Sequence, residues 1–277
     1  KEYKLLDKNF PTIDPKKPYA LTKEEEDIME RLERAFENCE KLQRHMHFLL
    51  NKGGLYKVYN GNLLYHGCVP LKEDGNLKSV RIFGRAYKGK GLYEVLESYV
   101  RKGFYAMDPK EKERGKDIMW YIWLSENSPL FGKDKMATFE RYFLAEKETH
   151  KEKKNPYYLL LEDEKVVGKI LKEFGLENED AHIINGHVPV KCKDGENPVK
   201  CGGKVLVIDG GFSKAYQKET GIAGYTLIYN SYGLILAAHK PFESTEAAIE
   251  KESDIHSDST VVKRTLERKK VEDTDVG

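Results

Sequence analysis

Hydrophobic residues recur at helical spacing over several stretches of the chain. The first stretch follows the capping-box pair Thr22 and Glu25 and runs to Leu49, which predicts one long amphipathic helix that ends near Gly53. The last stretch, 245–270, is acidic toward its start and basic toward its finish, as the helix dipole favours, and predicts a charged C-terminal helix. Other predicted helices cover 91–107, 111–125, 137–147 and, with a break after Leu161, 155–174.

Short β-prone runs alternate with glycine-rich turns elsewhere in the chain. The runs 55–59 and 62–65 flank Asn60-Gly61, which is the strongest short-range signal of a β-hairpin. Two later runs of β-branched and apolar residues, 183–184 and 205–208, each end in a turn that contains glycine. The segment 1–21 carries three prolines and is expected to be extended. The mixture of strands and helices predicts an α/β fold.

Two histidines follow β-prone runs in the same local pattern. His66 precedes a glycine and His187 follows one, and a proline comes shortly after each. If the two strands are neighbours in one sheet, the imidazoles converge at the edge where α/β proteins usually place a site. Such a pair can serve a nucleophile, act as acid and base, bind a metal, or be structural. Metal ligation fits the pair best, because no G-x-S-x-G turn is present and Cys68 alone makes no dyad with His66.

Charge and composition exclude several classes of partner. The net charge is +1 and the basic and acidic residues are interleaved, so no global field favours nucleic acid or an anionic membrane. No apolar run approaches the roughly 20 residues of a membrane span, and a cytoplasmic protein is expected. The four cysteines are too few and too scattered for a disulfide framework, so free thiols are expected.

Two blocks, L-L-Y-H-G-C-V-P and I-I-N-G-H-V-P-V, resemble the last two metal-binding blocks of the calcineurin-like metallophosphatases. Longer segments, N-F-P-T-I-D-P-K-K-P-Y-A-L-T, E-K-L-Q-R-H-M-H-F-L and S-P-L-F-G-K-D-K-M-A-T-F-E-R-Y-F, closely resemble one family, the class III or Firmicutes-type fructose-1,6-bisphosphatases. The resemblance covers nearly all of the chain. It implies the C-terminal part of a calcineurin-like β-sandwich flanked by helices, with an added helical region.

The chain departs from the superfamily pattern in its carboxylates. Calcineurin-like phosphatases begin with Asp-x-His, Gly-Asp-x-x-Asp and Gly-Asn-His-Asp/Glu, and the latter two are absent here. Asp-x-His occurs at 180–182, where it begins a strand, and at 254–256, in the charged tail; neither fits the missing block. We therefore expect the C-terminal part of a longer protein, whose missing N-terminal part supplies the bridging carboxylates. The chain alone is expected to be inactive.

The resemblance also implies a site and a reaction. With the missing part present, Mn²⁺ or Mg²⁺ ions form a dinuclear site, in which His66 and His187 complete the coordination of one ion. Neutral imidazole suits manganese better than magnesium. The implied reaction hydrolyses fructose 1,6-bisphosphate to fructose 6-phosphate and phosphate, in gluconeogenesis. Candidates for binding the second phosphate and the sugar are Gly210, Gly211, Ser213, Lys214, Arg85 and Tyr216.

Five regions follow from this interpretation. An extended lead-in and long helix cover 1–54, a hairpin with the first histidine block 55–90, and a helical region 91–178. A sheet with the Gly-His block and substrate loop covers 179–243, and the charged helix 244–277. The apolar helix faces also predict a homo-oligomer. Two alternatives stay open: another calcineurin-like phosphatase, acting on a phosphoprotein or a dinucleoside polyphosphate, and a non-catalytic assembly or regulatory module.

Overall fold

The computed structural model describes residues 1–209, 212–242, 244–252 and 256–277, and the chain forms two compact units. One unit combines Lys1–Gly54 with Lys135–Lys153, and the other combines Leu55–Asp134 with Lys154–Gly277. Among the helices of the described residues, none is both long and apolar enough to cross a lipid bilayer. The four cysteines are free thiols, as predicted.

The smaller unit joins the N-terminal segment to two helices and a later insertion. The segment before Thr22 is largely without regular structure, and its Leu6 amide donates to the Phe143 carbonyl at 2.8 Å. The capping box is confirmed, because the Glu25 amide donates to Thr22 Oγ1 at 3.3 Å and the Thr22 amide donates to the Glu25 carboxylate at 2.8 Å. The helices of this unit are α1 (Lys23–Glu37), α2 (Glu40–Lys52), α5 (Thr138–Phe143) and the 3-10 helix η1 (Lys147–His150).

The single helix predicted from Thr22 to Leu49 is wrong, because the chain breaks between α1 and α2. Asn38 leaves the helical conformation and its side-chain Nδ2 donates to the Arg34 carbonyl at 2.8 Å. Asparagine side chains compete in this way for backbone groups, which favours a helix end. Cys39 is then extended and precedes α2, which begins at Glu40.

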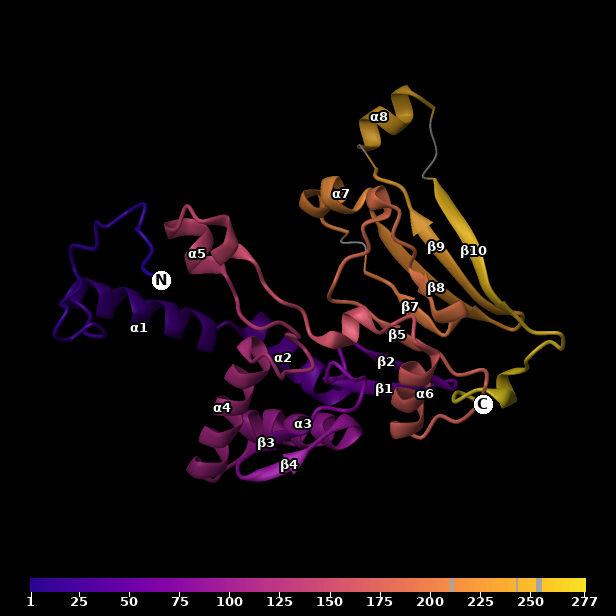
Figure 1. Ribbon diagram of the computed structural model, residues 1–277, viewed down its shortest axis with the longest axis horizontal. Coiled ribbons are helices and arrows are strands. Elements are labelled where there is room, and N and C mark those ends of the chain that lie inside the picture. Colours follow the sequence, from indigo (N-terminus) through magenta and orange to yellow (C-terminus); the bar gives the residue numbers. More distant parts are fainter. Residues whose placement is uncertain (210–211, 243, 253–255) are drawn as a thin grey trace. The chain divides into compact units, whose positions relative to one another are not determined.

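A mixed five-stranded sheet lies at the centre of the larger unit (Figure 1), in the order β1-β2-β5-β7-β6. Its strands are β1 (Tyr56–Tyr59), β2 (Asn62–Tyr65), β5 (Ile183–Asn185), β7 (Val205–Val207) and β6 (Val199–Lys200). The predicted hairpin is confirmed: Asn60 and Gly61 both have positive φ, 49° and 73°, as a tight turn between β1 and β2 requires. β2 pairs in parallel with β5, and β5 with β7.

The two faces of this sheet pack against different layers. Leu63 lies in register with Ile183, and both belong to a core that includes Val167 and Ile170 of α6 (Glu164–Glu173). The next positions, Ile184 and Leu206, point to the other face and pack with Leu234 of a second sheet. That antiparallel sheet comprises β8 (Gly224–Asn230), β9 (Gly233–His239) and β10 (Ser257–Arg264). The α/β class is confirmed, with two packed sheets and a helical outer layer.

The predicted C-terminal helix is the largest error of the sequence analysis. Among the described residues of 245–270, the α-helix is limited to α8 (Thr245–Glu250), whereas β10 pairs with β9 from Ser257 to Arg264. The β-branched run Thr260-Val261-Val262 suits a strand, and the charges around it are compatible with either structure. The edge of β9 decides the outcome, because its unpaired backbone groups are satisfied by β10.

Two helices, α3 (Gly89–Tyr105) and α4 (Pro109–Leu124), cross each other closely. The hairpin of β3 (Val80–Ile82) and β4 (Arg85–Tyr87) packs with them in one hydrophobic cluster. The backbones meet where Gly103 faces Gly115: a Cβ on Gly115 would lie 2.1 Å from the Gly103 nitrogen. Glycine is therefore required at this crossing. The remaining helices are α7 (Lys214–Thr220), η2 (Pro156–Leu159), η3 (Cys192–Asp194), η4 (Cys201–Gly203) and η5 (Val271–Asp273).

His182, at the start of β5, makes the stability of the fold depend on pH. It is buried, and its Nδ1 donates to Asn62 Oδ1 at 3.0 Å. Burial, followed by the charges of Lys263 and Lys204, lowers the pKa of His182 to about 4. The unfolded chain, with an ordinary histidine pKa near 6.5, therefore binds a proton more readily than the folded chain between about pH 6.5 and pH 4.

We therefore expect the free energy of unfolding to fall as the pH is lowered from about 6.5 to about 4. The loss attributable to His182 is on the order of 3 kcal/mol, since each pKa unit is worth about 1.4 kcal/mol. Urea unfolding of the wild type and of His182→Gln at pH 7 and pH 4.5 measures it. The glutamine variant should lose less stability on acidification than the wild type; equal losses in both proteins would contradict the assignment to His182.

Candidate metal centre

His66 and His187 follow two adjacent parallel strands and meet at one edge of the central sheet. In β2 and β5, Leu64 lies opposite Ile184, so both strands end at the same edge. His66 Nε2 lies 3.0 Å from His187 Nδ1, and the two ring centroids are 4.9 Å apart at an interplanar angle of 72°. The convergence predicted from the sequence is confirmed.

Hydrogen bonds to two backbone carbonyls hold the two histidine-bearing loops together. The Gly186 amide donates to the His66 carbonyl at 2.9 Å, and Asn185 Nδ2 donates to the Gly67 carbonyl at 3.1 Å. His187 itself has a φ of 68°, in the left-handed region that a residue with a side chain rarely adopts. Such strain costs about 1–3 kcal/mol and persists only where the surroundings fix the backbone, as these bonds do. In this left-handed backbone conformation, the His187 ring faces His66.

The hydrogen bonds of the His187 ring define its neutral tautomer. Its Nε2 lies 2.9 Å from the carbonyl oxygen of Phe131, and a carbonyl accepts only, so Nε2 carries the proton. Nδ1 then has a free lone pair, which accepts from His66 Nε2. Burial lowers the pKa of His187, and repulsion from His66 lowers it further, although the Phe131 carbonyl and Asp209 oppose this. His187 is therefore neutral at pH 7, as a metal ligand must be.

The separation of the two nitrogens matches one metal ion bound to both rings, provided that the proton between them is removed. Two nitrogens that coordinate one ion at about 2.1 Å in adjacent positions lie about 3.0 Å apart, as His66 Nε2 and His187 Nδ1 do. A backbone carbonyl that holds the second ring nitrogen of a ligand, as Phe131 does for His187, is a usual support of metal-binding histidines. Across the part of the chain that the structure describes, no group of three His, Cys, Asp or Glu residues forms a metal site.

The structure argues against a cysteine nucleophile at this site. Cys68 is fully buried, and burial raises the pKa of its thiol to about 12. A thiolate is the reactive form, so Cys68 is inert at neutral pH.

The other candidate residues that the structure describes belong to α7, β4 and the residue before α7. Ser213 precedes α7, whose first residue is Lys214, and the Ser213 carbonyl accepts from the Tyr216 amide at 2.9 Å. The Tyr216 side chain is exposed. Arg85 begins β4, opposite Ile82. Gly210 and Gly211, predicted as an anion-binding turn, lie outside the described residues.

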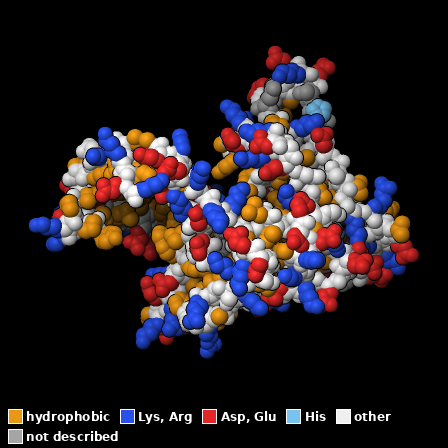
Figure 2. Space-filling view, viewed as in Figure 1, with side chains coloured by type: hydrophobic (Ala, Val, Ile, Leu, Met, Phe, Trp, Pro, Cys, Tyr) orange, Lys and Arg blue, Asp and Glu red, His pale blue; other side chains and the backbone are white. Residues whose placement is uncertain are grey.

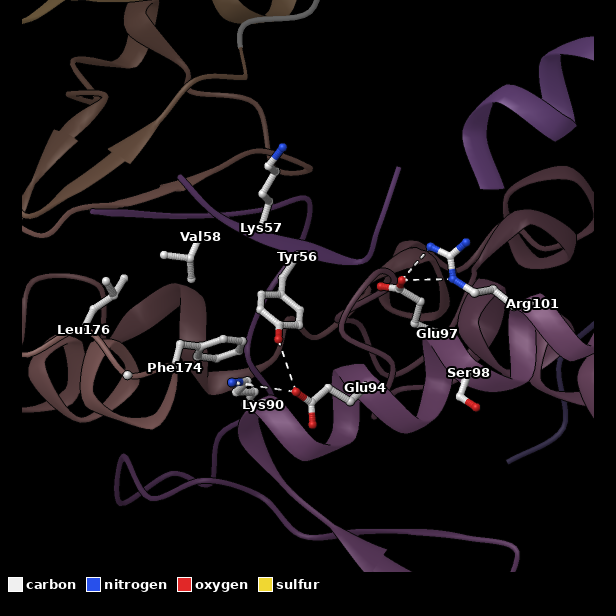
Figure 3. A pocket seen from close by; sticks show the side chains of 11 residues that line it. Tyr56, Lys57, Val58, Lys90, Glu94, Glu97, Ser98, Arg101, Phe174 and Leu176 are labelled. Atoms are coloured by element: carbon white, nitrogen blue, oxygen red, sulfur yellow. Dashed lines mark hydrogen bonds and ion pairs between the residues drawn. The ribbon is translucent and has the colours of Figure 1, made fainter. Parts of the chain in front are cut away.

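A cavity of about 750 Å³ lies beside β1 and is lined by α3 and the end of α6 (Figure 3). Its side chains pair with one another: Glu94 lies 3.8 Å from Lys90, and Glu97 lies 2.7 Å from Arg101. A phosphate that entered this cavity would meet carboxylates already bound to the cations. The cavity therefore does not suit a sugar bisphosphate.

Two functional features were missed from the sequence. No pattern marks the Phe131 carbonyl as a partner of His187, since the two residues lie 56 positions apart. The second is the buried hydrogen bond from Asn185 to the Gly67 carbonyl, which depends on β2 and β5 being neighbours. The S-P-L-F-G segment pointed to the family and gave no indication of this contact.

Comparison with known proteins identifies the family. A sequence model described as Firmicute fructose-1,6-bisphosphatase matches residues 1–277. The chain is 57% identical over 280 residues to the class 3 fructose-1,6-bisphosphatase of Alkaliphilus metalliredigens, and 56% identical over 278 residues to that of Clostridium botulinum strain Hall. In both cases the match covers 100% of this chain and 42% of the relative. No solved structure matches significantly. The chain belongs to the Firmicute fructose-1,6-bisphosphatase family, and it spans less than half the length of these curated relatives.

Proposed function

We propose that this chain forms part of a metal-dependent fructose-1,6-bisphosphatase, which hydrolyses the 1-phosphate of fructose 1,6-bisphosphate to give fructose 6-phosphate in gluconeogenesis. One observation carries the proposal: in a chain of this family, His66 Nε2 and His187 Nδ1 lie 3.0 Å apart at one sheet edge. The strand ends, the second sheet and the outer helices support a calcineurin-like architecture. The missing carboxylates would come from the part of the relatives' length that this chain does not span.

The residues of the chain would prepare the site for the ion. The Phe131 carbonyl holds the Nε2 proton of His187 and leaves Nδ1 as a ligand. His66 would have to present Nε2 without its proton, so its proton would move to Nδ1. When bound, a dinuclear metal centre supplies an activated water and stabilises charge on the phosphate oxygens. We propose Mn²⁺ as the preferred ion, with Mg²⁺ as the alternative, because neutral imidazole suits Mn²⁺ better.

The phosphate and sugar contacts and the assembly are further parts of the proposal. The turn of Gly210, Gly211 and Ser213 with Lys214, together with Arg85 and Tyr216, is proposed to bind the second phosphate and the sugar. A homo-oligomer is supported by Trp120 and Trp123 on α4, which are 61% and 60% exposed with ring centroids 5.4 Å apart. Exposed aromatic pairs of this kind are typical of interfaces. The proposal includes a cytoplasmic location.

A phosphate-release assay on fructose 1,6-bisphosphate tests the function. This chain would be assayed alone, and after co-expression with the part of the Alkaliphilus metalliredigens enzyme that it does not span, each with Mn²⁺ and with a chelator. Activity is expected in the co-expressed sample with Mn²⁺, and none in the chain alone. Activity of the chain alone would contradict the split site. A panel containing phosphoserine peptide and dinucleoside polyphosphate tests the other phosphatases, and inactivity on every substrate would favour a non-catalytic module.

A further inference from the structure

The helix α1 carries an exposed apolar stripe. Ile28, Leu32 and Phe36 recur every four residues on one face and are 54%, 49% and 64% exposed. Met29 flanks them and is 55% exposed, and α1 has no buried residue at all. Figure 2 shows hydrophobic side chains gathered over the part of the molecule that holds α1. We call these four residues the α1 stripe.

A stripe of this kind requires a partner for physical reasons. An isolated helix of 15 residues is marginal in water, and helices in proteins gain most of their stability from packing their apolar face. The polar face of α1 carries an exposed ion pair between Glu30 and Arg34, which is worth little. A contiguous apolar surface rimmed by charges is the usual mark of an interaction site.

The charge of α1 restricts the identity of the partner. Its sequence KEEEDIMERLERAFE has seven acidic and three basic residues, a net charge of 3 − 7 = −4. Two copies of α1 packed together would each bring this negative charge, so self-pairing through the stripe is disfavoured. The complementary surface is an apolar groove with a basic rim.

Two observations indicate which molecule covers the α1 stripe. The histidine pair lacks further metal ligands within the described residues, and the relatives carry more than half of their length outside the matched region. We infer that the α1 stripe is the docking surface for that other part of the fructose-1,6-bisphosphatase chain. Docking would hold the ligand-bearing part on this chain. This inference rests on the proposed function in one respect: the proposed function is the reason to expect that the other part supplies the remaining metal ligands.

Co-purification tests the docking surface separately from catalysis. Tagged chain would be co-expressed with the complementary part of the Alkaliphilus metalliredigens enzyme, and the amount of untagged part captured would be measured. Leu32→Lys, which places a charge in the stripe, is expected to reduce capture at least tenfold. The control Arg34→Lys places the same side chain on the opposite, polar face without changing the charge of α1, and should leave capture unchanged. Thermal unfolding of each variant alone should match that of the wild type.

Three results would overturn the inference. The first is the absence of capture by the wild type, or undiminished capture by Leu32→Lys. The second is a lower melting temperature of isolated Leu32→Lys, which would show that the stripe is covered within this chain. The third is self-association of the isolated chain, by mass measurement in solution, that Leu32→Lys abolishes. Capture without phosphatase activity would instead contradict the proposed function and leave the docking surface standing.

Discussion

Replacing His66 or His187 by alanine in the co-expressed protein is expected to lower Mn²⁺-dependent phosphate release by at least about 100-fold. Loss of a residue that merely supports a metal ligand costs about 10–100-fold, and each histidine is proposed to be a ligand itself. His66 is exposed and His187 is partly exposed, so both variants should fold and still capture the complementary part. Metal content after gel filtration provides a readout independent of activity, and both variants should bind less Mn²⁺.

A control variant tests whether the loss of activity is specific to His66 and His187 or follows from the removal of any histidine. His45→Ala removes an exposed histidine of α2 and should retain both activity and bound Mn²⁺. If His66→Ala and His187→Ala also retained full activity and metal, the pair would be structural. The non-catalytic interpretation of this chain would then gain weight.

Gly115→Ala is expected to destabilise this chain strongly. The new Cβ would lie 2.1 Å from the Gly103 nitrogen and 2.2 Å from the Gly103 Cα, and these are backbone atoms that cannot turn aside. α3 and α4 would have to separate, at a cost of about 1–3 kcal/mol or more for overpacking. This cost exceeds the roughly 1 kcal/mol by which alanine favours a helix over glycine.

Gly168→Ala in α6 is the matched control, because a Cβ there would meet no atom within 4 Å. The same substitution should then raise stability by up to about 1 kcal/mol, through helix propensity alone. Thermal and urea unfolding of the 277-residue chain measure both effects. Opposite signs are expected for the two variants. A Gly115→Ala protein as stable as the wild type would show that the helices do not cross as closely as described.

The sequence alone determined the features that depend on neighbouring residues. Asn60-Gly61 specified the hairpin because both positions accept positive φ. Thr22 and Glu25 specified the start of α1, and hydrophobic periodicity located α3 and α4 within two residues. The position of the two histidines after short apolar runs was sufficient to nominate the site. Each of these signals lies within a few residues along the chain, where local sterics and hydrogen bonding decide the conformation.

Only the tertiary structure decided which distant segments meet. Residues separated by 121 positions, His66 and His187, are joined because β2 and β5 pair, and the Phe131 carbonyl reaches His187 from a third segment. The strand β10 replaced a predicted helix because the edge of β9 offered it a partner. Local periodicity carries no information about such partners. Hydrogen bonding and burial between remote segments select among conformations that the local sequence allows about equally.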